Sequence, residues 1–197
     1  MRGLILALTL AVTAPAASAQ QNGYVAAGPA LAAADWDMAY LLAAGEGQVA
    51  ADLITWARLR NGDGVLDEFA AFAALHPGWP GLSRLRRVGE TVILADEDPV
   101  KIIAYFAGAA PQTGQGTARL ASALIAAGQA DAARSLLTTA WLEFGLDEDG
   151  EAAMLAEHAA ILLPLHGARV DALLWRWRTA QAESLLDHLP EAEQALA

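Results

Sequence analysis

Histidine and cysteine are the side chains with which proteins most often bind transition metals, and this chain has four histidines and no cysteine. The histidines are His76, His158, His166 and His188. No two of them are three or four positions apart, so no helix would present two imidazoles on one face. The absence of cysteine excludes disulfides, zinc–thiolate sites, iron–sulfur clusters and thiol nucleophiles. We therefore expect no metal site and no cofactor.

Two acidic, glycine-containing segments have the residue types of a calcium loop. Asn61–Gly64 can be aligned with positions 3 to 6 of such a loop, but Leu59 then stands at position 1 and Ala70 at position 12, where carboxylates are required. The segment Asp147–Gly150 fails the same test. Both segments are interpreted as turns that precede helices with acidic amino termini.

The signatures of nucleophilic and phosphate chemistry are missing from the sequence. No serine lies in a Gly-x-Ser-x-Gly segment, and there is no glycine-rich phosphate-binding loop. A small hydrolase would need two carboxylates facing one cleft, and the spacing of the acids does not bring two together. We therefore name no catalytic residue, and the sequence leaves open whether the chain belongs to an enzyme.

Tryptophans and arginines are the remaining candidates for ligand contacts. Indoles can stack on sugar rings, but isolated tryptophans in short helices more often pack between helices, and Trp175 and Trp177 cannot share one helix face, so one of them is expected to be exposed. Arg84, Arg86 and Arg87 could bind a carboxylate. The interpretation favoured here is a solvated helix face paired with Glu90. The six tryptophans are Trp36, Trp56, Trp79, Trp141, Trp175 and Trp177.

The overall composition excludes two classes of protein. Of the 197 residues, 55% are hydrophobic and 18% are charged, which is too apolar for intrinsic disorder. Twelve Lys and Arg residues stand against 23 Asp and Glu residues, giving a formal net charge of −11. Nucleic-acid binding requires clustered basic residues, so a nucleic-acid partner is not expected.

The amino terminus has the pattern of an export signal. Arg2 is followed by an apolar stretch from Leu4 to Val12 and by Ala17-Ser18-Ala19, which predicts a signal peptide over residues 1–19 that is cleaved after Ala19. The apolar stretch is too short to span a membrane, which takes about 20 residues. Because the chain lacks cysteine, we predict a periplasmic location, with a flexible mature amino terminus over 20–28.

The mature chain is predicted to be all-α, because helix formers dominate and no long alternation of apolar and polar residues indicates a strand. Helices are expected to pair into hairpins, as in an irregular, tetratricopeptide-like α-superhelix (solenoid), with a globular helical bundle as the alternative. Ten helices are predicted over 29–44, 46–60, 64–76, 80–95, 98–109, 115–127, 130–144, 148–163, 168–178 and 179–188.

Turn and capping residues set the predicted boundaries. Pro80 is expected at the first position of a helix, Asp98 is expected to cap the helix that begins at Pro99, and Gly128 is expected to close another. A last segment, Glu191 to Ala197, opens a helix without a closing cap. The helical domain 29–197 is therefore expected to be a truncated piece of a longer one.

A series of strings resembles the amino-terminal helical domain of soluble lytic murein transglycosylases. The most specific part is His76-Pro77-Gly78-Trp79-Pro80, within the string Leu75 to Leu82. The similarity extends over nearly the whole mature chain. Its other parts are Asp52–Arg60, Phe69, Phe72, Leu85–Arg87, Gly89–Glu90, Ile103–Phe106, Pro111, Thr113, Gly114, Arg119–Ala121, Trp141 and the stretch from His158 through Arg169 to Trp175.

The resemblance implies an exported protein that acts on peptidoglycan. Enzymes of this family cleave the MurNAc–GlcNAc bond without adding water and leave a 1,6-anhydro end. The reaction belongs to a carboxy-terminal, goose-lysozyme-like domain with a catalytic Glu-Ser dipeptide and a Gly-Leu-Met-Gln-type string. This chain has no such string, and its Glu183-Ser184 dipeptide lies in a segment that matches the helical hairpins, where Leu185 and Leu186 are expected in the core.

The expected function is therefore that of a non-catalytic helical scaffold of a periplasmic lytic transglycosylase-like protein. Its expected partners are peptidoglycan glycan strands and periplasmic proteins. The alternative is a free-standing periplasmic helical-repeat adaptor that binds a protein or peptide in a concave groove.

Overall fold

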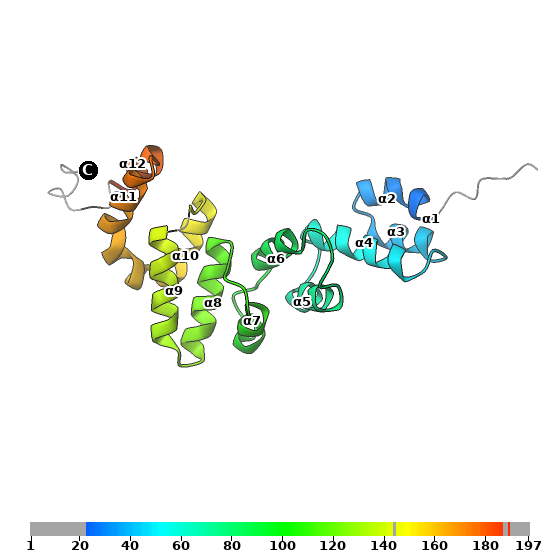
Figure 1. Ribbon diagram of the computed structural model, residues 1–197, viewed down its shortest axis with the longest axis horizontal. Coiled ribbons are helices and arrows are strands. Elements are labelled where there is room, and N and C mark those ends of the chain that lie inside the picture. Colours follow the sequence, from blue (N-terminus) through cyan, green and yellow to red (C-terminus); the bar gives the residue numbers. More distant parts are fainter. Residues whose placement is uncertain (1–22, 144, 187–188, 190–197) are drawn as a thin grey trace, which may run out of the picture. The chain divides into compact units, whose positions relative to one another are not determined.

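The computed structural model describes residues 23–143, 145–186 and 189, and every regular element among these residues is a helix (Figure 1). The all-α fold of short helical hairpins predicted from the sequence is confirmed. The predicted signal peptide, the final segment from Glu191 and His188 lie outside the described residues. In the part of the chain that the structure describes, no helix has both the length and the apolar character needed to cross a membrane.

The chain divides into two compact units, and the first ends at Ile54. The described part of this unit contains α1 (Gly23–Ala26), α2 (Gly28–Ala32), α3 (Trp36–Ala43) and the start of α4 (Gln48–Arg60). Its core is made almost entirely of alanines, whose small side chains let short helices pack closely. The buried residues of this core are Ala27, Ala30, Ala39, Ala43, Ala50 and Ile54.

One expectation for the first unit is corrected. The helix predicted over 29–44 is broken, because Ala34 has a positive φ of 55° and Asp35 then starts α3 by accepting a hydrogen bond from the amide of Met38. Within the segment 20–28, for which flexibility stays a prediction, residues 23–26 form α1, and the amide of Gly23 donates to Glu46 at 2.6 Å.

The second unit begins at Thr55, inside α4, and holds the remaining helices. Neighbouring helices pair as hairpins, most closely α8 with α9, followed by α7 with α8 and α11 with α12 (Figure 1). The 3₁₀ turn η1 (Leu163–Leu165) leads directly into α11. The elements are α5 (Leu66–Leu75), α6 (Leu82–Thr91), α7 (Pro99–Tyr105), α8 (Gly114–Ala126), α9 (Ala130–Glu143), α10 (Glu148–Leu162), α11 (His166–Trp175) and α12 (Thr179–Leu186).

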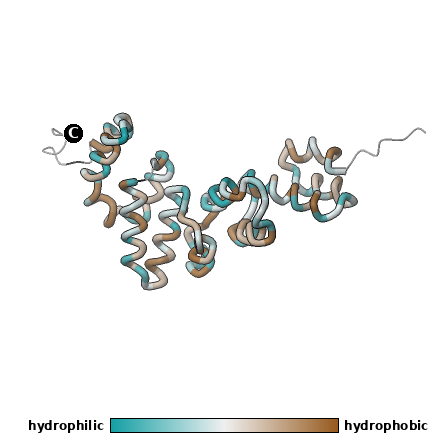
Figure 2. The backbone as a smooth tube through the Cα atoms, in the orientation of Figure 1, coloured by the Kyte–Doolittle hydropathy of each residue, from teal (hydrophilic) through white to brown (hydrophobic). Residues whose placement is uncertain are grey.

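The core of the second unit is a series of small clusters rather than one centre. The largest cluster lies between α8, α9 and α10 and is built around Trp141, Leu137 and Met154, all fully buried. Further clusters lie around Phe69 and Phe72 and around Leu173. Figure 2 shows hydrophobic residues along every hairpin, whereas α6 is mostly hydrophilic. Each hairpin therefore buries its apolar face mainly against its neighbours.

The string Leu75–Leu82 forms the connection between α5 and α6. His76 ends α5, and its ring packs against Phe72 and Trp79 at centroid distances of 4.5 and 4.8 Å. Pro80 was expected at the first position of the next helix, but α6 begins at Leu82, because Gly81 takes the preceding position with a left-handed φ of 76°. By contrast, Asp98 caps α7 as predicted, accepting from the amide of Val100.

Four helices end in the same hydrogen-bonded motif. One residue after the cap takes a left-handed φ, its amide bonds to the carbonyl three positions back, and the next amide bonds five positions back. Glycine, which adopts this conformation without steric cost, holds the position at Gly62 and Gly128. Ala34 and Trp177 hold the same position with φ of 55° and 59°. Each of these two bears a conformational cost that the two glycines avoid.

The amino termini of α8 and α10 touch through their backbones. A Cβ atom added to Gly114 would lie 2.4 Å from the carbonyl oxygen of Gly150, and one added to Gly150 would lie 3.2 Å from the Cα of Gly114. The first separation is far below van der Waals contact and the second is tight, so the helices meet this closely because position 114 is a glycine.

Replacing Gly114 by alanine is expected to lower the free energy of unfolding by about 2–3 kcal/mol, because neither backbone can move aside without disturbing its helix. Urea denaturation followed by circular dichroism measures the change. Gly78→Ala is the matched control, since a Cβ there has no atom within 4 Å and the backbone is not left-handed. If the two variants have equal free energies of unfolding, then α8 and α10 can move apart at position 114 with little loss of stability.

Candidate functional site

The Glu-Ser dipeptide lies on the exposed face of α12. Glu183 and Ser184 are both solvent-exposed, and the Ser184 hydroxyl donates to the carbonyl of Gln181 at 2.9 Å. Leu185 is buried and Leu186 packs beside it, as predicted for core residues. The structure therefore gives Glu183 no enclosed surroundings in which a carboxyl could serve as a general acid.

The described histidines are separated from one another. His76 lies in the aromatic cluster of the α5–α6 connection, whereas His158 and His166 are buried in α10 and at the start of α11. Among the described residues, no group of three or more histidine or acidic side chains is placed to hold a metal ion.

The two calcium-like segments are turns followed by acidic helix starts, as the sequence predicts. In the first, the side chain of Asn61 donates to Asp63 at 2.6 Å. In the second, Asp147 caps α10 by accepting from the amide of Gly150 at 2.9 Å. Asp147 is thus engaged with a helix amino terminus, where negative charge is favourable, whereas Asp63 is engaged with Asn61 in the turn after α4.

The arginines of α6 are exposed as predicted, but the expectation for Glu90 is wrong. Glu90 is 1% exposed and lies in the core of the second unit rather than on the solvated face with Arg84, Arg86 and Arg87. Spacing along α6 places it near the arginines, but its hydrogen bonds go to a segment more than twenty positions later.

The Glu90 carboxylate ties α6 to the start of α8. It accepts hydrogen bonds from the backbone amides of Gln112 and Thr113 and from the Thr113 hydroxyl, at 2.7–2.9 Å. Thr113 in turn caps α8 by accepting from the amide of Gly116. Burial raises the pKa of Glu90, and the hydrogen bonds from Thr113 and Gln112 oppose that rise. This cluster is satisfied internally and holds the two helices together.

A serine, a histidine and a glutamate also meet between α8 and α10, but not as a catalytic triad. The Ser122 hydroxyl oxygen lies 3.2 Å from Nε2 of His158 and 2.8 Å from Glu157. The same Nε2 lies 2.9 Å from the carbonyl of Ala118, which can only accept, so this nitrogen carries the proton. It cannot then take a proton from Ser122, as a general base must. The cluster joins two helices.

A buried arginine joins α9, α10 and α11. Arg169 is 1% exposed, forms an ion pair with Glu151 and donates to the carbonyl of Trp141. Its guanidinium lies 4.2 Å from the centre of the Trp141 ring, which is also in edge contact with His166. Burial lowers the pKa of Arg169 to about 10, so it stays charged at neutral pH. This arginine therefore stabilises the packing of α11 against α9 and α10.

The described tryptophans differ in burial, and Trp36, at the start of α3, is half-buried. Trp141 is fully buried, and Trp56 and Trp79 pack against the cluster around Phe69, which confirms the core interpretation for these three. Trp175 and Trp177 are 86% and 89% exposed. One of this pair was expected to be exposed, and both are, because the helix ends at Trp175 and the chain turns before Trp177.

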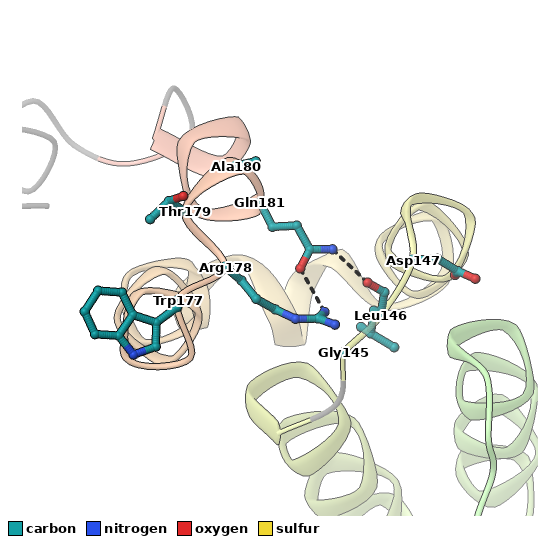
Figure 3. Close-up of a pocket in the computed structure, with 8 residues that line it drawn as sticks. All are labelled: Gly145, Leu146, Asp147, Trp177, Arg178, Thr179, Ala180 and Gln181. Carbon is teal, nitrogen blue, oxygen red and sulfur yellow. Dashed lines mark hydrogen bonds between the residues drawn. The ribbon is translucent and has the colours of Figure 1, made fainter.

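Two hollows flank this exposed pair. One, of about 370 Å³, is lined among the described residues by Asp171, Leu174, Trp175 and Trp177. The other, of about 490 Å³, lies between the α9–α10 connection and the start of α12 (Figure 3). In it Arg178 donates to Gln181, and Gln181 donates to the carbonyl of Leu146. The exposed tryptophans and their hollow are the best candidate for a ligand-binding surface in the described chain.

Comparison with known protein families, with curated proteins and with solved structures finds no match to this chain.

Proposed function

We propose that this protein is a non-catalytic helical scaffold that acts on peptidoglycan as part of an exported lytic transglycosylase-like protein. The observation that carries the proposal is the most specific string of the resemblance, His76 to Pro80. Its aromatic side chains pack in the connection of the α5–α6 hairpin, where Phe72 and Trp79 meet edge to face at 5.4 Å. The string thus has a structural part to play in a helical hairpin, which is the role the resemblance requires.

Two further observations support the scaffold role. The all-α fold of short hairpins has the type of architecture that the resemblance implies, and the Glu183-Ser184 dipeptide is exposed on a helix rather than set in a cleft. Export through cleavage after Ala19 belongs to the same proposal. A net charge of −11 gives no bulk attraction to peptidoglycan, so binding would have to rest on local contacts.

The proposal is tested with the full chain expressed in a Gram-negative host. We expect recovery from the periplasm with Gln20 as the first residue, shown by mass spectrometry. We also expect the protein to sediment with purified peptidoglycan sacculi and to release no anhydro-muropeptides. Failure to sediment would contradict the proposed function. Release of anhydro products would contradict the non-catalytic role, and Glu183→Gln would then be the first variant to examine.

The second candidate function is a periplasmic adaptor that binds a protein or peptide. It is favoured by a groove of about 400 Å³ between the start of α5, the α6–α7 connection and α8. Val65 and Leu94 line this groove and are 60% and 62% exposed. Co-purification of the same periplasmic protein with wild type, lost on Val65→Asp and Leu94→Asp, would favour this function over the first.

A further inference from the structure

Trp175 and Trp177 are the most exposed large hydrophobic side chains in the described chain. An indole buries more apolar surface than any other side chain when it is covered, so leaving two in water forgoes a large stabilisation. The core of the last hairpin does not need them, since Val170, Leu173, Ala182 and Leu185 fill it. Folding of this hairpin therefore does not explain why these positions hold tryptophan.

The backbone at Trp177 adds a second observation. This residue occupies the left-handed position after α11, with φ of 59°, while Gly62 and Gly128 occupy the same position after α4 and α8. A side chain in this conformation is unfavourable, and glycine is the residue that helix ends usually place there. Trp177 is therefore held in a less favourable backbone conformation and also leaves its indole in water. Both costs oppose a purely structural role.

The surroundings of the pair are polar. Asp171, Arg176, Arg178 and Thr179 are all exposed around the two indoles. The guanidinium of Arg176 donates to the carbonyl of Leu142 at 2.7 Å, and that of Arg178 donates to Gln181 at 3.0 Å. Figure 3 shows the indole of Trp177 extending away from Arg178 and Gln181. The pair thus lies among hydrogen-bonding groups, and both indoles line the hollow of about 370 Å³.

This pattern selects one class of ligand. A pyranose ring has an apolar face whose C–H groups carry partial positive charge and stack on the negative face of an indole, and its edge carries hydroxyl and amide groups for partners such as Asp171. Nucleic acid bases also stack on tryptophan, but they require a basic groove, and this chain has a net charge of −11. A protein partner is less favoured, because the exposed charged residues Asp171, Arg176 and Arg178 surround the indoles, and charged residues are depleted from the cores of protein interfaces.

We propose that Trp175 and Trp177 form a carbohydrate-stacking surface that holds a glycan strand, with the Asp171 carboxylate accepting hydrogen bonds from sugar hydroxyls. This inference rests on the proposed function for the identity of the strand, an N-acetylated β-1,4 glycan. The hollow of about 370 Å³ beside the two rings gives the sugar edge a place next to Asp171.

The test uses the full chain and two probes, soluble chitotetraose and peptidoglycan sacculi. Intrinsic tryptophan fluorescence is titrated with chitotetraose, and the fraction of protein bound to sacculi is measured by sedimentation. The variants are W177G, W175A and the double variant W175A/W177G. Val100→Ala and Leu163→Ala, which shorten exposed apolar side chains elsewhere in the second unit, are the matched controls.

We expect the double variant to lose at least about tenfold in affinity for chitotetraose, while the two controls bind as wild type does. W177G is expected to melt about 2–4 °C higher than wild type, because glycine suits the left-handed position, so loss of binding cannot be ascribed to unfolding. Ala34→Gly should raise the melting temperature in the same direction without changing glycan binding.

The outcomes separate this inference from the proposed function. If wild type sediments with sacculi and the double variant sediments equally, the stacking surface is overturned and the proposed function stands. If wild type does not sediment with sacculi but binds chitotetraose, and the double variant loses that binding, the proposed function is overturned and the stacking surface stands. A dimer of wild type that the double variant abolishes, without glycan binding, would assign the pair to protein contact and overturn the inference.

Discussion

Replacing Glu90 by alanine is expected to lower the free energy of unfolding by about 2–4 kcal/mol. The carboxylate is 1% exposed and accepts from two backbone amides and one hydroxyl at the start of α8. Alanine would leave these part-buried donors without the carboxylate, and a donor that loses its partner away from water costs more than the bond itself contributed. Chemical denaturation monitored by circular dichroism gives the difference.

The control for this prediction is Glu143→Ala, which removes an exposed carboxylate at the end of α9 and should change stability by less than about 0.5 kcal/mol. Glu90→Gln keeps one acceptor oxygen but adds an amide donor facing other donors. Its loss of stability should therefore lie between those of Glu90→Ala and Glu143→Ala. If the Glu90→Ala variant has the same free energy of unfolding as the Glu143→Ala variant, then water replaces the carboxylate. The hydrogen bonds between Glu90 and the start of α8 would then contribute nothing to stability.

The same carboxyl carries a pH dependence whose sign follows from its burial. The pKa of Glu90 is raised above its ordinary value of 4.5, so the folded protein binds this proton more tightly than the unfolded chain does. The part of its contribution that depends on protonation is therefore full below pH 4.5 and is lost as pH rises through the folded pKa, whereas the hydrogen bonds that Glu90→Ala removes remain. The stability of wild type relative to Glu90→Gln should decline over that rise, and an increase would contradict it.

Arg169→Ala is expected to have the largest effect of any single substitution considered, about 3–5 kcal/mol. The substitution removes the partner of Glu151, a hydrogen bond to the carbonyl of Trp141 and a cation–π contact in the core of the second unit. Glu151 would then hold a charge beside the core without its counter-ion, and a cavity would remain next to Trp141. Urea denaturation and the near-ultraviolet circular dichroism of Trp141 report the loss.

Two variants sharpen the Arg169 prediction. Arg134→Ala removes an exposed arginine from α9 and should be nearly neutral, which controls for the loss of positive charge in an acidic chain. Arg169→Lys keeps the charge but cannot reach Glu151 and the Trp141 carbonyl together, since an ammonium lacks the planar fork of a guanidinium. It should therefore lose about half as much as alanine does. A lysine variant as stable as wild type would show that charge alone matters.

Local sequence signals predicted the elements and many of their ends. Alanine and leucine content indicated helices, Asp98 and Pro99 marked the start of α7, and Gly128 marked the end of α8. These features depend on residues next to one another in the chain, which is why they can be read from it. The break at Ala34 was not predicted, because alanine favours helix. In the structure, the hydrogen-bonded cap at the end of α2 overrides that preference.

Contacts between residues far apart in the chain could not be predicted from local sequence signals. Glu90 was assigned to neighbouring arginines by helical spacing, whereas its donors are Gln112 and Thr113. The partners of Arg169 lie on two other helices. For the candidate site, the doubly exposed tryptophan pair was missed because the predicted helix ran to 178 and placed Trp177 inside it. A helix end is usually recognised from a glycine in the left-handed position. Trp177 holds that position after α11, so the sequence did not indicate the turn.

The backbone contact between α8 and α10 makes Gly114 and Gly150 interdependent. A Cβ at position 114 would lie 2.4 Å from the Gly150 carbonyl oxygen, whereas one at position 150 would lie 2.8 Å from the Asp147 carboxylate and 3.2 Å from the Gly114 backbone. Position 114 is therefore the more restricted of the two, and a small shift of the Asp147 side chain and of the α8 start would be needed to admit a side chain at 150. The spacing of these two helix starts is thus set mainly by the residue at 114, and we expect substitutions there to change the packing of both hairpins.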